Sequence, residues 1–245
     1  MPKTDIPLIN KIFLILETLA GESVALAIHQ IAERTGIPRP TVHRLLNQME
    51  ELGYVGCDHR VNCWFPGLRL AQLQPRGDFA ALKQAALPKM QFLHKTFDET
   101  VNLGVLTGGR IYYLMSLETT KALRWVVRPH QTDNFYSTAL GLSIVSHLPA
   151  VERDALLAHT DLKQQTEKTF TDMAELKTLL QRVRRKGWAQ EEGQNEEGVV
   201  CLGVPLLNDG YPLGAISISI PEFRMTKAME KPIVNALLSI SNLEV

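Results

Sequence analysis

Residues 26–55 read LAIHQIAERTGIPRPTVHRLLNQMEELGYV, and this stretch decides the fold of the N-terminal part of the chain. Apolar residues recur at helical spacing on both sides of a break at residues 35–38. Gly36 favours the left-handed backbone that ends a helix, and Pro38 favours the start of the next one. The pattern predicts a helix-turn-helix, whose second helix enters the major groove of DNA.

The second predicted helix has one apolar face and one polar face. Val42, Leu45, Leu46 and Met49 fall together and should be buried. Arginine can pair with guanine, and threonine can reach a phosphate or a thymine methyl group. The residues that we expect at the DNA are Arg39, Pro40, Thr41, His43, Arg44 and Asn47. The alternative is an ordinary helical hairpin whose polar face is simply solvated.

A β-hairpin is expected directly after this helix. Gly53 should end the helix, a strand should begin at Tyr54, and residues 58–60 should form the turn before a second strand over residues 61–65. Such a hairpin is a wing, and Arg60 at its tip could contact a phosphate or the minor groove. A plain surface hairpin with an exposed arginine is the competing interpretation.

Charge and composition limit the classes of function. Net charge is zero, and residues 1–74 hold seven basic and seven acidic residues, which argues against a general DNA-coating protein. Residues 37–48 carry two arginines and no acid, so one copy should bind DNA weakly and a homodimer reading two half-sites is favoured. The absence of a long apolar run and of a signal-peptide pattern predicts a cytoplasmic protein without a membrane span.

Three cysteines are too few for a secreted disulfide framework. Cys57, His59 and Cys63 lie close in sequence, but their spacing matches no closed zinc pattern and a fourth ligand is not evident. Side chains of the wing strands explain the same residues. We therefore expect no metal and no cofactor.

The segment QPRG at residues 74–77 divides the chain into domains 1–74 and 75–245. The second domain should open with a helix over residues 79–97, which Pro88 interrupts or restarts. Strands are expected at 100–106, 111–117, 123–127, 199–207 and 213–220, and helices at 149–160, 172–187 and 225–243. The order predicts a separate α+β domain with an antiparallel sheet.

Residues 133–143 are the second informative stretch, because a polar loop runs into a helix with small opening residues. Free N–H groups at Ala139, Leu140 and Gly141 could hold a carboxylate, with Ser137 and Thr138 as further candidate ligand-binding residues. Alternatively, Ser137 or Thr138 caps the helix and Gly141 permits close packing, and spacing alone favours this second interpretation. Further along, Ser217 and Ser219 share one strand face, which could bind a polar ligand or simply face solvent.

Several motifs together resemble the IclR family of bacterial transcription regulators. They are TGIPRPTVHRLL at 35–46, LGYV at 52–55, FPGLRL at 65–70, STALG at 137–141, GWA at 187–189, NEEGVVC at 195–201 and ISIS at 216–219. The resemblance covers nearly the whole chain. It implies a winged helix-turn-helix followed by a GAF-like effector-binding domain.

The resemblance also implies a small-molecule pocket. Its residues would be the backbone at Ala139 and Leu140, with Glu191, Cys201, Ser217 and Ser219, and we expect Val199 to bind the ligand as well. Two positions depart from the family pattern. Pro40 replaces a small hydroxyl residue, so the usual phosphate contact is lost there. Glu191 replaces an aspartate, and its longer side chain would shrink the pocket or select another ligand.

The leading hypothesis is a DNA-binding transcription regulator, with repression favoured, whose operator binding responds to a small organic acid. It would act on double-stranded DNA as a homodimer or a dimer of dimers. A second hypothesis is a DNA-binding protein whose C-terminal domain only assembles oligomers. A third is an enzyme acting on a small acid with Cys201 as nucleophile, although Cys201 lies within a strand and no histidine accompanies it.

Overall fold

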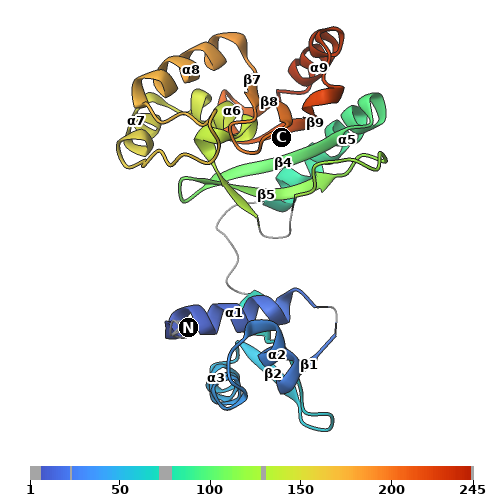
Figure 1. Cartoon of the computed structure of the whole chain (residues 1–245), viewed down its shortest axis with the longest axis vertical. Coiled ribbons are helices and arrows are strands. Elements are labelled where there is room, and N and C mark those ends of the chain that lie inside the picture. The colour runs from blue at the N-terminus through green and yellow to red at the C-terminus, as the bar shows by residue number, and fades with distance from the viewer. Residues whose placement is uncertain (1–6, 23, 72–78, 128–130, 244–245) are drawn as a thin grey trace. The chain divides into compact units, whose positions relative to one another are not determined.

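The computed structural model describes residues 7–22, 24–71, 79–127 and 131–243. The chain divides into two compact units, residues 1–77 and 78–245 (Figure 1). The predicted boundary at residues 74–77 lies outside the described residues. Within the described ranges, each helix is too short or too polar to span a lipid bilayer.

The first unit is a winged helix-turn-helix, as predicted. Its strands pair antiparallel in the order β1-β3-β2. The elements are α1 (Leu8–Ala20), β1 (Leu26–Ala27), α2 (Ile28–Thr35), α3 (Arg39–Glu51), β2 (Val55–Asp58), β3 (Cys63–Pro66) and α4 (Leu68–Ala71).

The turn between α2 and α3 forms as the sequence indicates. Gly36 takes a left-handed conformation with φ of +68°, which only glycine adopts without strain. Just before it, the Thr35 hydroxyl donates to the Ile31 carbonyl at 2.7 Å and so satisfies a group at the helix end. The predicted apolar face of α3 (Val42, Leu45, Leu46 and Met49) is buried in one core with α1 and α2.

The wing differs from the prediction in two details. Its second strand begins at Cys63 and not at Val61, because residues 59–62 form the turn and Asn62 takes a positive φ of 52°. The two-residue strand β1 was not predicted, since so short a segment carries no periodicity of its own. It pairs with β3, Leu26 lying opposite Trp64.

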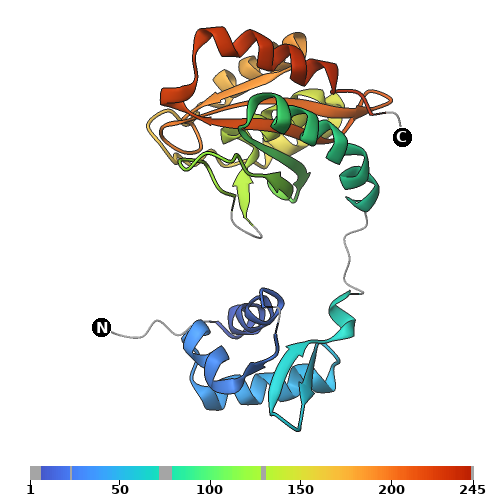
Figure 2. The ribbon, with the colours of Figure 1, turned by 90° about the vertical axis from the view of Figure 1, so that its right-hand side faces the viewer.

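The second unit is built on one antiparallel sheet with the strand order β6-β5-β4-β9-β8-β7. Helices α5 and α9 cover one face (Figure 2), while α6 lies against the other and α8 packs on α6. The elements are α5 (Phe79–Phe97), β4 (Thr100–Thr107), β5 (Arg110–Leu117), β6 (Thr132–Asn134), α6 (Ala139–His147), α7 (Ala150–Ala158), α8 (Met173–Lys186), β7 (Ala189–Glu192), β8 (Val199–Asn208), β9 (Tyr211–Pro221) and α9 (Lys227–Ser239).

The structure of the second unit differs from the predictions in three places. Residues 123–127 form no strand, although their apolar residues suggested one. The edge strands β6 and β7 were not predicted, because they are short and polar. The closing helix ends at Ser239 and not at residue 243, because the chain beyond it pairs with the end of β8. There the N–H of Leu243 donates to the Leu207 carbonyl at 2.8 Å.

Helix α5 runs without a break through Pro88, contrary to the predicted interruption. Proline removes one hydrogen bond within a helix, to the carbonyl four residues earlier. Both Pro88 and Gln84, which carries that carbonyl, lie on the exposed side of α5. Water can therefore satisfy the carbonyl, and the helix continues.

Candidate functional site

The exposed face of α3 carries the residues predicted at the DNA. Thr41 is half-buried, whereas Arg39, Pro40, His43, Arg44 and Asn47 are exposed. The opposite face holds the unit's core, so the side chains on this face are available to a partner. A helix presented in this way fits the major groove.

The arginines of this surface are free of competing acids. Among the described residues, no carboxylate oxygen lies within 4.0 Å of a guanidinium nitrogen of Arg39, Arg44 or Arg60. Arg44 donates only a long hydrogen bond of 3.4 Å to Gln48. At the wing, the Asp58 carboxylate accepts from the backbone N–H of Arg60 at 3.0 Å and shapes the turn. The arginine side chains therefore remain available for phosphates or bases.

Pro40 lies in the first turn of α3 and leaves that turn with fewer donors. The Pro38 carbonyl already accepts from the N–H groups of Thr41 and Val42, at 2.9 and 3.0 Å. Pro40 itself has no N–H. The start of α3 therefore offers Arg39 as its remaining free backbone donor, in addition to its side chains.

A small cavity lies between the sheet and the start of α6, and we call it the inner pocket. Of the ten residues predicted to bind a ligand, those that line it are Thr138, Ala139, Leu140, Glu191, Val199, Cys201, Ser217 and Ser219. They come from α6 and its N-cap residue Thr138, and from β7, β8 and β9. The chain thus brings together positions that are up to 81 residues apart in sequence.

Ser137 and Gly141 do not line the pocket, which corrects the predicted carboxylate site. The Ser137 hydroxyl donates to Asn195 Oδ1 at 2.8 Å, and the Gly141 N–H donates to the capping hydroxyl of Thr138 at 3.1 Å. A Cβ at Gly141 would lie 2.2 Å from the Phe135 carbonyl oxygen, so this glycine serves close packing. Only the N–H groups of Ala139 and Leu140 remain for an anion.

Sequence reasoning missed Asn102, Tyr113, Trp125, Asn195 and Glu196, which complete the lining. One signal existed for Asn102, because it is a polar residue on the strand face opposite Val101 and Leu103. The other four residues lie in segments that only the tertiary structure brings next to the pocket.

The polar groups of the inner pocket are connected to one another. Asn102 Nδ2 donates to the Ser219 hydroxyl at 3.1 Å, and Ser219 Oγ lies 3.2 Å from the Cys201 sulfur. Ser116 donates to Asn102 Oδ1 at 2.8 Å. Ser217 and Ser219 are 2% and 3% exposed, so the solvent-facing alternative for this strand face is wrong. Within the described residues, the Ser217 hydroxyl has no hydrogen bond and is free for a ligand.

Glu191 is the acid at the inner end of this cluster and is 2% exposed. Burial raises the pKa of its carboxyl from 4.5 to about 7, although the backbone N–H of Asn195, at 3.0 Å from Oε1, acts in the opposite direction. Near neutral pH the carboxyl is therefore close to half-protonated. It can donate a hydrogen bond to a ligand as well as accept one.

The surroundings of Cys201 disfavour nucleophilic chemistry at its thiol. Burial raises the pKa of its thiol well above the ordinary value, and the nearby Glu191 raises it further. The thiolate, which is the nucleophile, is therefore disfavoured. The thiol acts here as a weak hydrogen-bonding group beside Ser219.

The inner pocket is tight in this structure. Its volume is about 20 Å³, close to the space that one water molecule occupies. Trp125, from the segment between β5 and β6, forms part of its wall. An organic acid would therefore have to displace part of this wall on binding.

Cys57, His59 and Cys63 do not converge in the wing. Cys57 lies opposite Trp64 and Cys63 lies opposite Asp58, so the two cysteines point to opposite faces of the hairpin. His59 Nε2 lies 3.5 Å from a carboxylate oxygen of Glu50. Among the described residues, no group of three or more side chains is arranged to hold a metal ion.

Comparison with known sequences matches both units. Residues 9–59 match the family model described as the IclR helix-turn-helix domain, and residues 78–242 match the one described as bacterial transcriptional regulator IclR C-terminal. The chain is 30% identical over 219 residues to the HTH-type transcriptional regulator KdgR of Escherichia coli strain K12. That alignment covers 89% of this chain and 83% of the relative.

Solved structures give the same result for the fold. The Thermotoga maritima IclR structure matches with a TM-score of 0.73 at 26% identity and covers 95% of both chains. An IclR homolog from Microbacterium hydrocarbonoxydans, complexed with 4-hydroxybenzoate, matches with a TM-score of 0.72 at 24% identity and 96% coverage of both chains. At that identity the second match supports the fold alone.

Proposed function

This chain belongs to the IclR family of bacterial transcription regulators, and we propose that a small organic acid in the inner pocket controls its binding to an operator. The observation that carries the proposal is the convergence of Glu191, Cys201 and Ser217 with the free N–H groups of Ala139 and Leu140. These groups offer donors to a carboxylate inside a buried, mostly uncharged setting.

The DNA half of the proposal rests on the exposed face of α3. Arg39, Thr41, His43 and Arg44 would read bases or phosphates in the major groove, with Asn47 further along the helix. Arg60 on the wing would contact the backbone or the minor groove. Because Pro40 has no N–H or hydroxyl, we expect it to contact DNA only through its ring.

The ligand half rests on the character of the inner pocket. A carboxylate would accept hydrogen bonds from the start of α6, and the Ser217 hydroxyl would bind its polar substituent. A protonated Glu191 would add a donor in place of a repelling charge. The donors at the start of α6 and the Ser217 hydroxyl make hydroxy or keto acids suitable first candidates.

We propose that the two halves communicate through a homodimer or a dimer of dimers. With so few cations per unit, two recognition helices must act together to reach useful affinity. An effector that prefers one arrangement of the subunits would change the spacing of the two helices and hence operator affinity. We propose that the bound protein represses transcription, so release of the operator on effector binding would lift the repression.

A gel-shift titration with DNA from upstream of its own gene tests the DNA half. We expect Arg44→Ala to reduce operator affinity about tenfold or more, because a paired arginine–guanine contact contributes about 1–3 kcal/mol. The charge-matched control is Lys95→Ala, an exposed residue of α5 that should leave affinity unchanged. Wild-type binding no tighter to this DNA than to random DNA would refute the proposal.

A thermal-shift panel of keto, hydroxy and aromatic acids tests the ligand half. A binder should raise the unfolding temperature of the wild type but not of Ser217→Ala. Stabilisation by none of these acids would favour the alternative in which the C-terminal unit serves only to assemble oligomers.

A further inference from the structure

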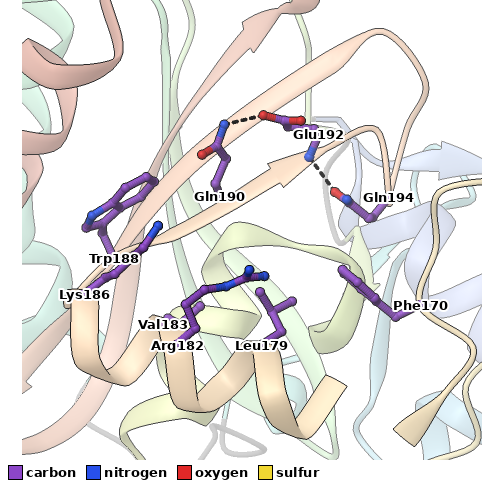
Figure 3. A pocket seen from close by; sticks show the side chains of 9 residues that line it. All are labelled: Phe170, Leu179, Arg182, Val183, Lys186, Trp188, Gln190, Glu192 and Gln194. Carbon is purple, nitrogen blue, oxygen red and sulfur yellow. Dashed lines mark hydrogen bonds between the residues drawn. The ribbon is translucent and has the colours of Figure 1, made fainter. Parts of the chain in front are cut away.

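A larger cavity lies on the outside of the sheet, between α8 and the edge strand β7 (Figure 3). We call it the outer groove. Its volume is about 270 Å³, against about 20 Å³ for the inner pocket. It shares no lining residue with the inner pocket, so the function proposed above leaves it unexplained.

One wall of the outer groove is positively charged. Arg182 and Lys186 are exposed, project from α8 and line the groove (Figure 3). Lys186 Nζ lies 5.0 Å from the centre of the Trp188 ring. Among the described residues, neither cation has a carboxylate within 4.0 Å. The groove thus combines two unpaired cations with an aromatic surface.

The remaining walls are apolar or neutral, with one exception. Leu179 and Val183 are buried below the two cations and provide an apolar floor. The exception is Glu192, which lies toward the opposite end from Lys186 (Figure 3). Its carboxylate accepts a hydrogen bond from the Gln190 amide, so this acid is already engaged.

The edge of β7 is poorly suited to pairing with another strand. It is four residues long, and the side chain of Gln194 accepts from the N–H of Glu192. An added strand would need that N–H. The groove therefore fits a small molecule better than an extended peptide.

We propose that the outer groove is a second ligand site, which binds a small carboxylate with an apolar or aromatic body. The carboxylate would pair with Arg182 and Lys186, since charge-assisted bonds to arginine are the strong ones. The body would lie on Leu179 and against Trp188. Along β7, Glu191 points into the inner pocket while Gln190 and Glu192 line the groove, so one strand separates the two sites.

Calorimetric titration of the full chain with benzoate tests this site. We expect Arg182→Gln to weaken benzoate binding about tenfold or more, because it removes the charged half of the contact. Arg185→Gln is the matched control, since Arg185 is exposed on the same helix but does not line the groove. It should bind benzoate like the wild type.

Ser217→Ala separates the two sites, because it alters only the inner pocket. Unchanged benzoate binding in this variant, together with the loss in Arg182→Gln, would support the outer groove. Loss in Ser217→Ala with normal binding by Arg182→Gln would place benzoate in the inner pocket and refute the second site. Equal binding by all variants, or no binding at millimolar benzoate, would refute it as well.

Discussion

In α3 the polar side chains face water, and in the inner pocket they face one another. Arg39 and Arg44 are exposed to water, and among the described residues no carboxylate oxygen lies within 4.0 Å of their guanidinium nitrogens. They therefore lose little hydration free energy on folding and are available to bind a partner. Glu191 and Ser219 have lost their water and depend on groups within the protein. Burial has accordingly shifted the pKa of Glu191 to about 7.

This contrast indicates which substitutions should change binding and which should change stability. Changes on α3 should alter DNA affinity without altering the fold, because the exposed face contributes little to the core. Changes in the pocket should alter stability, ligand binding or both, depending on whether the side chain has a partner inside the protein. The following predictions test this contrast.

The largest effect should come from Gly141→Ala, in the first turn of α6 beside the pocket. A methyl group there would lie 2.2 Å from the Phe135 carbonyl oxygen, and backbone cannot move aside cheaply. We expect the free energy of unfolding to fall by about 3 kcal/mol, measured by chemical denaturation. Gly21→Ala is the control, since its methyl group would make only ordinary contacts of 3.4 Å or more. A stable Gly141→Ala protein would contradict the close packing of α6.

The next effect should be the pH dependence of Glu191→Gln. The carboxyl binds its proton more tightly in the folded state, with a pKa of about 7 against an ordinary 4.5. Its contribution to stability is therefore complete below about pH 4.5 and is lost as pH rises through 7. Glutamine does not ionise, so the variant does not lose this stability as pH rises. The free energy of unfolding of Glu191→Gln, relative to that of the wild type, should therefore be higher at pH 8 than at pH 4.5 by about 2 kcal/mol.

The control for this experiment is Glu197→Gln, an exposed residue of the loop that follows β7. Its effect on stability should not change with pH over this range. Parallel pH profiles for wild type and Glu191→Gln, measured by thermal unfolding, would show that Glu191 is not held in a desolvated site.

A smaller effect is expected for Arg60→Ala on the wing. Losing one backbone contact should weaken binding by about 1 kcal/mol, equally for operator and random DNA. The slope of log affinity against log salt should also fall by about 1. Filter binding across salt concentrations measures both. A loss confined to the operator would instead assign Arg60 a role in reading sequence.

The smallest stability change should come from Ser217→Ala. Its hydroxyl has no partner among the described residues, so removal should change stability by less than about 0.5 kcal/mol while abolishing effector binding. Ser219→Ala should cost about 1 kcal/mol, because Asn102 would lose the acceptor at 3.1 Å. Equal losses of stability for Ser217→Ala and Ser219→Ala in thermal unfolding would contradict the structure, in which only the Ser219 hydroxyl has a hydrogen-bond partner among the described residues.

The periodicity of the sequence determined the local features of both units. The buried and exposed faces of α3 follow from helical geometry alone, and the shared face of Ser217 and Ser219 follows from strand alternation. The helix-turn-helix could be recognised because Gly36 and Pro38 set the backbone conformation of the few residues next to them in the chain. The short edge strands were not predicted. The four residues of β7, one alanine and three polar residues, are too few to show a period, and they form a strand only because β8 lies beside them.

Only the tertiary structure decided what the polar residues do. Ser137 and Gly141 belong to the predicted motif, yet each is engaged by a neighbouring group, and Asn102 and Trp125 join the pocket from distant segments. The resemblance in sequence made Glu191 a candidate. Its raised pKa required burial under α6, because desolvation depends on everything that surrounds a group and not on its position in the chain.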